Sequence, residues 1–75
     1  MTKERLIRRL LNAESIINIA ARDIEDIGMW LLPNDRTRSH VLRNRAMEMK
    51  AAAADLRRLQ MEVENEEETE TETDD

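Results

Sequence analysis

Apolar residues recur along this chain in two long series with alternating spacings of four and three, separated by one break at Pro33-Asn34-Asp35. On an α-helix, this spacing forms a single stripe that can face a partner helix packed at a shallow angle. The sequence therefore predicts an all-α chain of two long helices folded into an antiparallel helical hairpin. The first series is Leu6, Leu10, Ala13, Ile17, Ala20, Ile24, Ile27 and Leu31, and the second is Leu42, Ala46, Met49, Ala53, Leu56, Gln60 and Val63, with Gln60 as its one polar member.

The local signals at the ends of the two series set the expected boundaries of the hairpin, which occupies residues 1–63. We expect a first helix over about 3–31, a turn over about 32–37 and a second helix over about 38–64. Thr2 is the expected N-cap of the first helix. Pro33 lacks a backbone donor and disfavours a helical conformation at Leu32, so the first helix should end there. Either Asn34 or Asp35 can cap the second helix, or that helix can start from Thr37 or Ser39.

Apolar residues also flank the first stripe on both sides, which bears on assembly. With Leu6 at heptad position d, the e positions include Ile7, Ala21 and Gly28, and the g positions include Ile16 and Trp30. Such a wide band suggests more than one neighbouring helix, and a core of this size is marginal without support. We therefore predict a homodimer that forms a four-helix bundle. The expected oligomer core is Leu6, Leu10, Ile17, Ile24, Ile27, Leu31, Leu42, Met49 and Leu56.

Charge is divided sharply between the helical body and the last part of the chain. Residues 1–60 hold all 12 Lys and Arg and 8 of the 17 Asp and Glu, a net +4, whereas residues 61–75 hold the other 9 acids and no base. Residues 64–75 contain no apolar side chain that could offset the entropy of ordering, so a disordered acidic tail is expected. This tail could simply keep the protein soluble, fold back over the basic end of the hairpin to inhibit nucleic-acid binding, or imitate a phosphate backbone toward another protein.

A basic periodicity on the second helix supports an alternative function. One flank carries a cation at every seventh residue and the opposite flank carries two more arginines, so phosphates could be bound there. Solvation and pairing with Asp23, Glu25 and Asp26 of the first helix explain the same charges, and no aromatic residues are interleaved for base stacking. The candidate nucleic-acid-binding residues are Arg36, Arg38, Arg43, Arg45, Lys50 and Arg57.

Trp30, the only aromatic residue, has two interpretations. It can close the end of the hydrophobic core beside the turn. Alternatively, Met29, Trp30 and Leu32 can form an exposed partner-binding patch, because tryptophan anchors and adaptable methionines are common at binding sites.

Several other classes of protein do not fit this sequence. His40 is the only histidine and there is no cysteine, so we expect no catalytic site, no metal and no cofactor. No apolar run approaches the ~20 residues that cross a bilayer, and the lack of cysteine fits the reducing cytoplasm. The expected function is that of a small, non-enzymatic protein-protein interaction module, an adaptor, regulator or inhibitor such as a prokaryotic or phage accessory protein. The alternative is a nucleic-acid-binding regulator.

Overall fold

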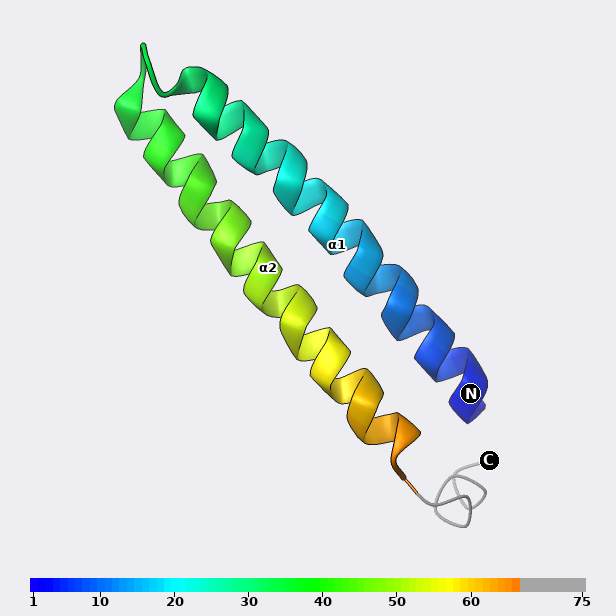
Figure 1. Cartoon of the computed structure of the whole chain (residues 1–75). Coiled ribbons are helices and arrows are strands. Elements are labelled where there is room, and N and C mark those ends of the chain that lie inside the picture. The colour runs from blue at the N-terminus through cyan, green and yellow to red at the C-terminus, as the bar shows by residue number, and fades with distance from the viewer. Residues whose placement is uncertain (67–75) are drawn as a thin grey trace.

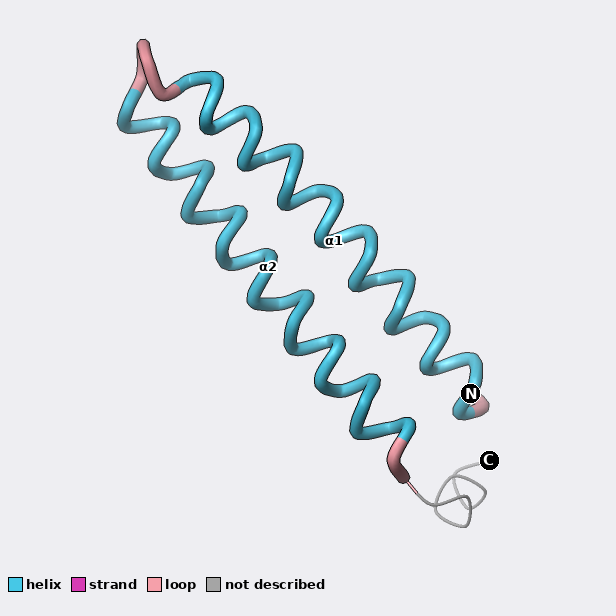
Figure 2. Tube along the Cα trace, in the orientation of Figure 1, coloured by secondary structure: helices cyan, strands magenta, loops and turns pink. Residues whose placement is uncertain are grey.

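The computed structural model describes residues 1–66 as two helices, α1 (Lys3–Leu31) and α2 (Arg36–Glu64), which lie side by side and antiparallel (Figures 1 and 2). The prediction of an all-α helical hairpin is thus confirmed. The principal extents of the hairpin are 57 × 14 × 14 Å, so the molecule is a rod two helices wide. Most of the acidic tail predicted over residues 64–75 lies outside the described residues; residue 64 itself ends α2.

Both helices begin with a side-chain cap. The Thr2 hydroxyl accepts a hydrogen bond from the Arg5 N–H (3.3 Å), and a carboxylate oxygen of Asp35 accepts one from the Arg38 N–H (3.0 Å). Each bond satisfies a backbone donor that has no partner within its own helix. Because Asp35 rather than Thr37 or Ser39 provides the second cap, α2 begins two residues before the expected position.

The turn holds the two helices together through backbone hydrogen bonds. The N–H groups of Asn34 and Asp35 both donate to the carbonyl oxygen of Leu31, at 3.0 and 2.8 Å. Pro33, directly before these two residues, cannot donate because its ring replaces the backbone N–H. The turn therefore reverses the chain within four residues, 32 to 35.

The face of α2 that packs on α1 matches the predicted stripe. Ala46, Ala53 and Val63 are buried, and the other members of the stripe are half-buried. Ser39, three residues before Leu42 at the start of the stripe, is fully buried as well. Small side chains occupy the most deeply buried positions, so α1 can approach α2 closely there.

The face of α1 that packs on α2 departs from the prediction toward the turn. At the predicted d positions, Leu6, Ala13 and Ala20 are half-buried and Ile27 is exposed. Leu10 is buried, and Ile17, Ile24 and Leu31 are half-buried, as expected of stripe residues, but between them the hairpin buries Ala21 and Gly28 while Ile27 is 51% exposed. In heptad terms, α1 packs on α2 most deeply through positions a and e, and its d positions lie at the edge of the contact. Near the turn, the lack of a side chain at Gly28 permits a close helix contact that the larger Ile27 at d would prevent.

Gly28 marks the tightest part of this contact. A Cβ atom built on it would lie 3.0 Å from Cγ of Arg43 and 3.2 Å from the carbonyl oxygen of Ser39. The second atom belongs to the backbone of α2 and cannot rotate away. The absence of a side chain at residue 28 therefore sets the separation of the helices near the turn.

Candidate interaction surfaces

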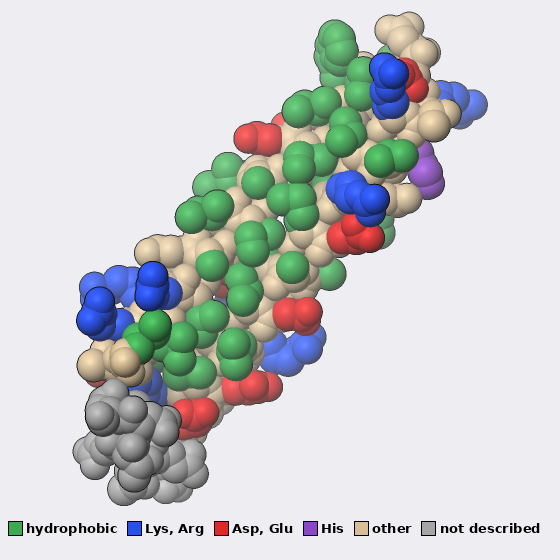
Figure 3. Space-filling view, turned by 180° about the vertical axis from the view of Figure 1, so that it is seen from behind, with side chains coloured by type: hydrophobic (Ala, Val, Ile, Leu, Met, Phe, Trp, Pro, Cys, Tyr) green, Lys and Arg blue, Asp and Glu red, His purple; other side chains and the backbone are tan. Residues whose placement is uncertain are grey.

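An apolar face covers one broad side of the hairpin. Figure 3 shows hydrophobic side chains running along most of its length over both helices, with charged side chains mainly at the edges. Since α1 packs on α2 through its a and e positions, its d and g positions point to one side of the rod, together with the matching flank of α2. We define the apolar face by Leu6, Ala13, Ile16, Ala20, Ile27 and Trp30 of α1 and Val41, Ala52 and Leu59 of α2.

Much of this face is accessible to solvent in the single hairpin. Ile16 is 65% exposed and Trp30 is 78% exposed, while Ile27, Val41 and Leu59 are about half exposed. By contrast, the buried hydrophobic residues of the hairpin are Leu10, Val63 and three alanines. Among residues 1–66, more large apolar side chains are therefore exposed than buried, the reverse of the usual arrangement in a stable monomer.

The α1 part of the apolar face has a heptad pattern of its own, which we call the outer seam. It consists of the d and g positions, and six of its eight residues are apolar. The corresponding flank of α2 has eight positions and is mainly charged. Three of the eight are the apolar residues Val41, Ala52 and Leu59, and the other five are Arg38, Arg45, Glu48, Asp55 and Glu62. The outer seam is Leu6, Arg9, Ala13, Ile16, Ala20, Asp23, Ile27 and Trp30.

The candidate partner-binding residues beside the turn differ in their exposure to solvent. Trp30 is too exposed to close the hairpin core, and its helical position places it at the end of the apolar face. Met29, one residue away, points to the other side of α1 and is also exposed. Leu32 is half-buried. A surface that includes Trp30 can continue along the d and g positions of α1.

The side of the hairpin opposite the apolar face is polar and carries the regularly spaced cations of α2. Lys50 Nζ lies 3.0 Å from a Glu25 carboxylate oxygen, and Arg57 lies 3.6 Å from Glu14, whose side chain is only 14% exposed. Arg43 is half-buried, with its Cγ atom near Gly28. Two cations of this series are therefore paired with α1 and a third is packed against it, while Arg36 is exposed at the turn end.

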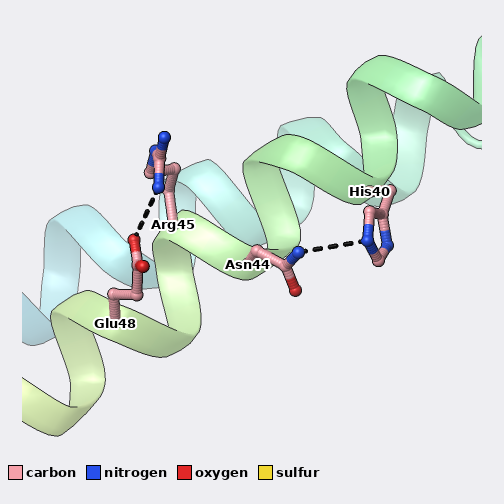
Figure 4. A network of polar contacts seen from close by, with 4 residues as sticks. All are labelled: His40, Asn44, Arg45 and Glu48. Atoms are coloured by element: carbon pink, nitrogen blue, oxygen red, sulfur yellow. Dashed lines mark hydrogen bonds and ion pairs between the residues drawn. The ribbon is translucent and has the colours of Figure 1, made fainter.

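The remaining candidate arginines, Arg38 and Arg45, lie on the flank of α2 beside the apolar face, and they and His40 form local contacts. Arg45 pairs with Glu48 at 2.9 Å, and the His40 ring is hydrogen-bonded to the Asn44 side chain at 3.1 Å (Figure 4). Arg38 pairs with Asp35 at 3.5 Å. All of these contacts join residues three or four apart on one helix, which is the ordinary pattern of an exposed helix surface.

The described part of the chain contains no cluster of three or more His, Cys, Asp or Glu side chains that could hold a metal ion. Neither helix is long and apolar enough to cross a membrane. Two surfaces of the hairpin therefore have distinctive chemistry. One is the apolar face, and the other is the opposite side with Arg36, Lys50 and Arg57, which we call the polar face.

Two residues of the predicted oligomer core, Leu6 and Ile27, lie on the outer seam. The predicted oligomer core does not include Ile16 of the outer seam, nor Val41 and Leu59, which belong to the apolar face on α2. Ile16 and Trp30 had been placed at apolar g positions, and this was the signal that could have identified the seam. The other expected core residues lie between α1 and α2, where Leu10 is buried and the rest are half-buried: Ile17, Ile24, Leu31, Leu42, Met49 and Leu56.

Comparisons with protein-family models, curated proteins and solved structures give no significant match to this chain.

Proposed function

We propose that this protein is a small, non-enzymatic helical interaction module that works as a homodimer, with two hairpins joined through their apolar faces in a four-helix bundle. The exposed apolar face is the observation that carries this proposal. A contiguous apolar surface of this kind on a small protein is typical of an interface. The hairpin core, with three alanines among its five buried hydrophobic residues, provides little burial free energy of its own.

Burial of the apolar face would leave the polar face available to another protein. Exposed methionines on the outer sides of α1 and α2, Met29, Met47 and Met61, border this face. Methionine side chains adapt to different partner shapes. The ion pairs of Lys50 with Glu25 and of Arg57 with Glu14 would add polar specificity to the same surface. The module would then act as an adaptor, regulator or inhibitor through its helix surfaces.

Light scattering of purified chains tests the homodimer directly with a matched pair of variants. Ile16 and Ile19 are isoleucines of the same helix with similar exposure, 65% and 61%, but only Ile16 belongs to the apolar face. We expect a dimeric wild type, a dimeric Ile19→Glu variant and a monomeric Ile16→Glu variant, because a buried unpaired carboxylate is costly. A monomeric wild type at high micromolar concentration, or a dimeric Ile16→Glu variant, would overturn the proposal.

A nucleic-acid-binding regulator is the alternative, supported by the cation at every seventh residue of α2. Arg36 to Arg57 covers about 32 Å at the helical rise of 1.5 Å per residue, which is long enough to follow several phosphates. The pairing of Lys50 and Arg57 with glutamates weakens this alternative. A salt-sensitive heavier complex with a mixed DNA and RNA pool, lost on Arg36→Ala and Arg43→Ala substitution, would favour it over the protein-binding function.

A further inference from the structure

We infer that the two copies join through α1 packed antiparallel on α1 of the second copy. The two-fold axis crosses the middle of that helix, so each outer seam packs against the outer seam of the other copy. This inference rests on the proposed homodimer and specifies which of its two possible packings occurs. In the other packing, the turns of the two hairpins lie at the same end and each α1 covers the partner's α2.

The first argument is the distribution of apolar residues. Six of eight outer-seam residues are apolar, against three of eight on the corresponding flank of α2. Pairing α1 with α1 buries apolar side chains against apolar side chains and leaves the charged flanks of α2 to face each other. Packing α1 on α2 would desolvate charges over the apolar seam, which costs free energy.

The second argument is that the outer seam is nearly symmetric about Ile16. Leu6 and Ile27 are placed at almost equal distances on either side of it, as are Ala13 and Ala20. An antiparallel two-fold arrangement therefore places Leu6 of each seam beside Ile27 of the other. In the middle, alanines can alternate with isoleucines, as a well-packed interface requires.

The charges of the outer seam meet opposite charges in this packing, as they also would in the other one. They therefore permit the α1-on-α1 packing, and the distribution of apolar residues selects it. The two charged members of the outer seam, Arg9 and Asp23, also lie symmetrically about Ile16 and have opposite signs. The same two-fold axis brings Arg9 of each copy near Asp23 of the other, twice in each dimer. Along α2, the half near the turn carries Arg38 and Arg45, and the antiparallel arrangement sets it against the half that carries Asp55 and Glu62 of the second copy.

Chemical cross-linking of a single introduced cysteine distinguishes the two packings, since the chain has no cysteine of its own. In the α1-on-α1 packing the two copies of residue 16 lie close together across the axis, so a short bismaleimide should link Ile16→Cys into a covalent dimer. The Ile19→Cys variant, whose side chain points outward, should stay unlinked. In the other packing residue 16 faces the partner's α2 near Ala52, and Ile16→Cys should stay unlinked too.

Exchange of the two seam charges provides an independent measurement. Arg9→Asp and Asp23→Arg alone each create two like-charge contacts in the dimer, so each should raise the dimer Kd about tenfold. The double variant restores both pairs and should recover most of the affinity. In the other packing Arg9 and Asp23 face Glu62 and Arg45 of the partner, so the double variant would be the weakest of the three.

These results separate the inference from the proposal on which it rests. A wild type that is dimeric by light scattering, with no Ile16→Cys cross-link and no recovery in the double variant, overturns the α1-on-α1 packing but leaves the homodimer. A monomeric wild type overturns both.

Discussion

Gly28 is the residue on which the spacing of the two helices depends most directly. In an ordinary helix glycine is unfavourable, and alanine or leucine in its place would raise helix propensity by nearly 1 kcal/mol. Here any side chain must displace the Ser39 carbonyl oxygen on α2. Ser39 opposite it is fully buried and its hydroxyl has no hydrogen-bond partner in the described structure, so its small size matters more than its polarity.

We expect Gly28→Leu to lower the free energy of unfolding by about 2 kcal/mol, the usual cost of overpacking a tight contact, despite the better helix propensity of leucine. Urea denaturation followed by circular dichroism measures this effect. Asn12→Leu, on the exposed outer surface of the same helix, is the control and should change stability little. Equal effects of the two substitutions would mean that the helices are not in close contact at residue 28.

At the level of elements, α2 starts where Asp35 caps it. Asp35→Ala should destabilise the protein by about 1 kcal/mol, because the Arg38 N–H then loses its acceptor. Asn34→Ala is the matched control, since the hydrogen bond that joins Asn34 to Leu31 uses only backbone atoms. Thermal unfolding of both variants checks the prediction, and an Asn34→Ala variant as unstable as Asp35→Ala would contradict the assignment of the cap.

The two helices also show how far sequence alone can predict such a hairpin. The apolar stripe of α2 is narrow and has mainly charged residues on both sides, so only one face of this helix could be buried. The stripe residues were therefore predicted correctly. The apolar band of α1 includes positions g, d, a and e, and periodicity cannot decide which half packs on α2. That choice depends on the close approach allowed by Gly28, a three-dimensional property. For the same reason, the apolar face was anticipated as an apolar flank but not located.

At the scale of the whole molecule, a rod two helices wide cannot place many side chains far from water. If the apolar faces join as proposed, folding and association are coupled, and the thermal midpoint must depend on protein concentration. We expect the wild-type Tm to rise by about 4 °C for each tenfold increase in concentration. The Ile16→Glu variant should show no such dependence, and a concentration-independent wild-type Tm would contradict the coupling.

The position of Trp30 gives the molecule a built-in optical reporter. Because the chain contains no other aromatic residue, all of its intrinsic fluorescence arises from one indole ring, which is largely in water at the end of the apolar face. A surface that covers this ring, whether a second copy or another protein, shifts the emission to shorter wavelength. Assembly at this end of the hairpin can therefore be followed in the native chain without attaching any label.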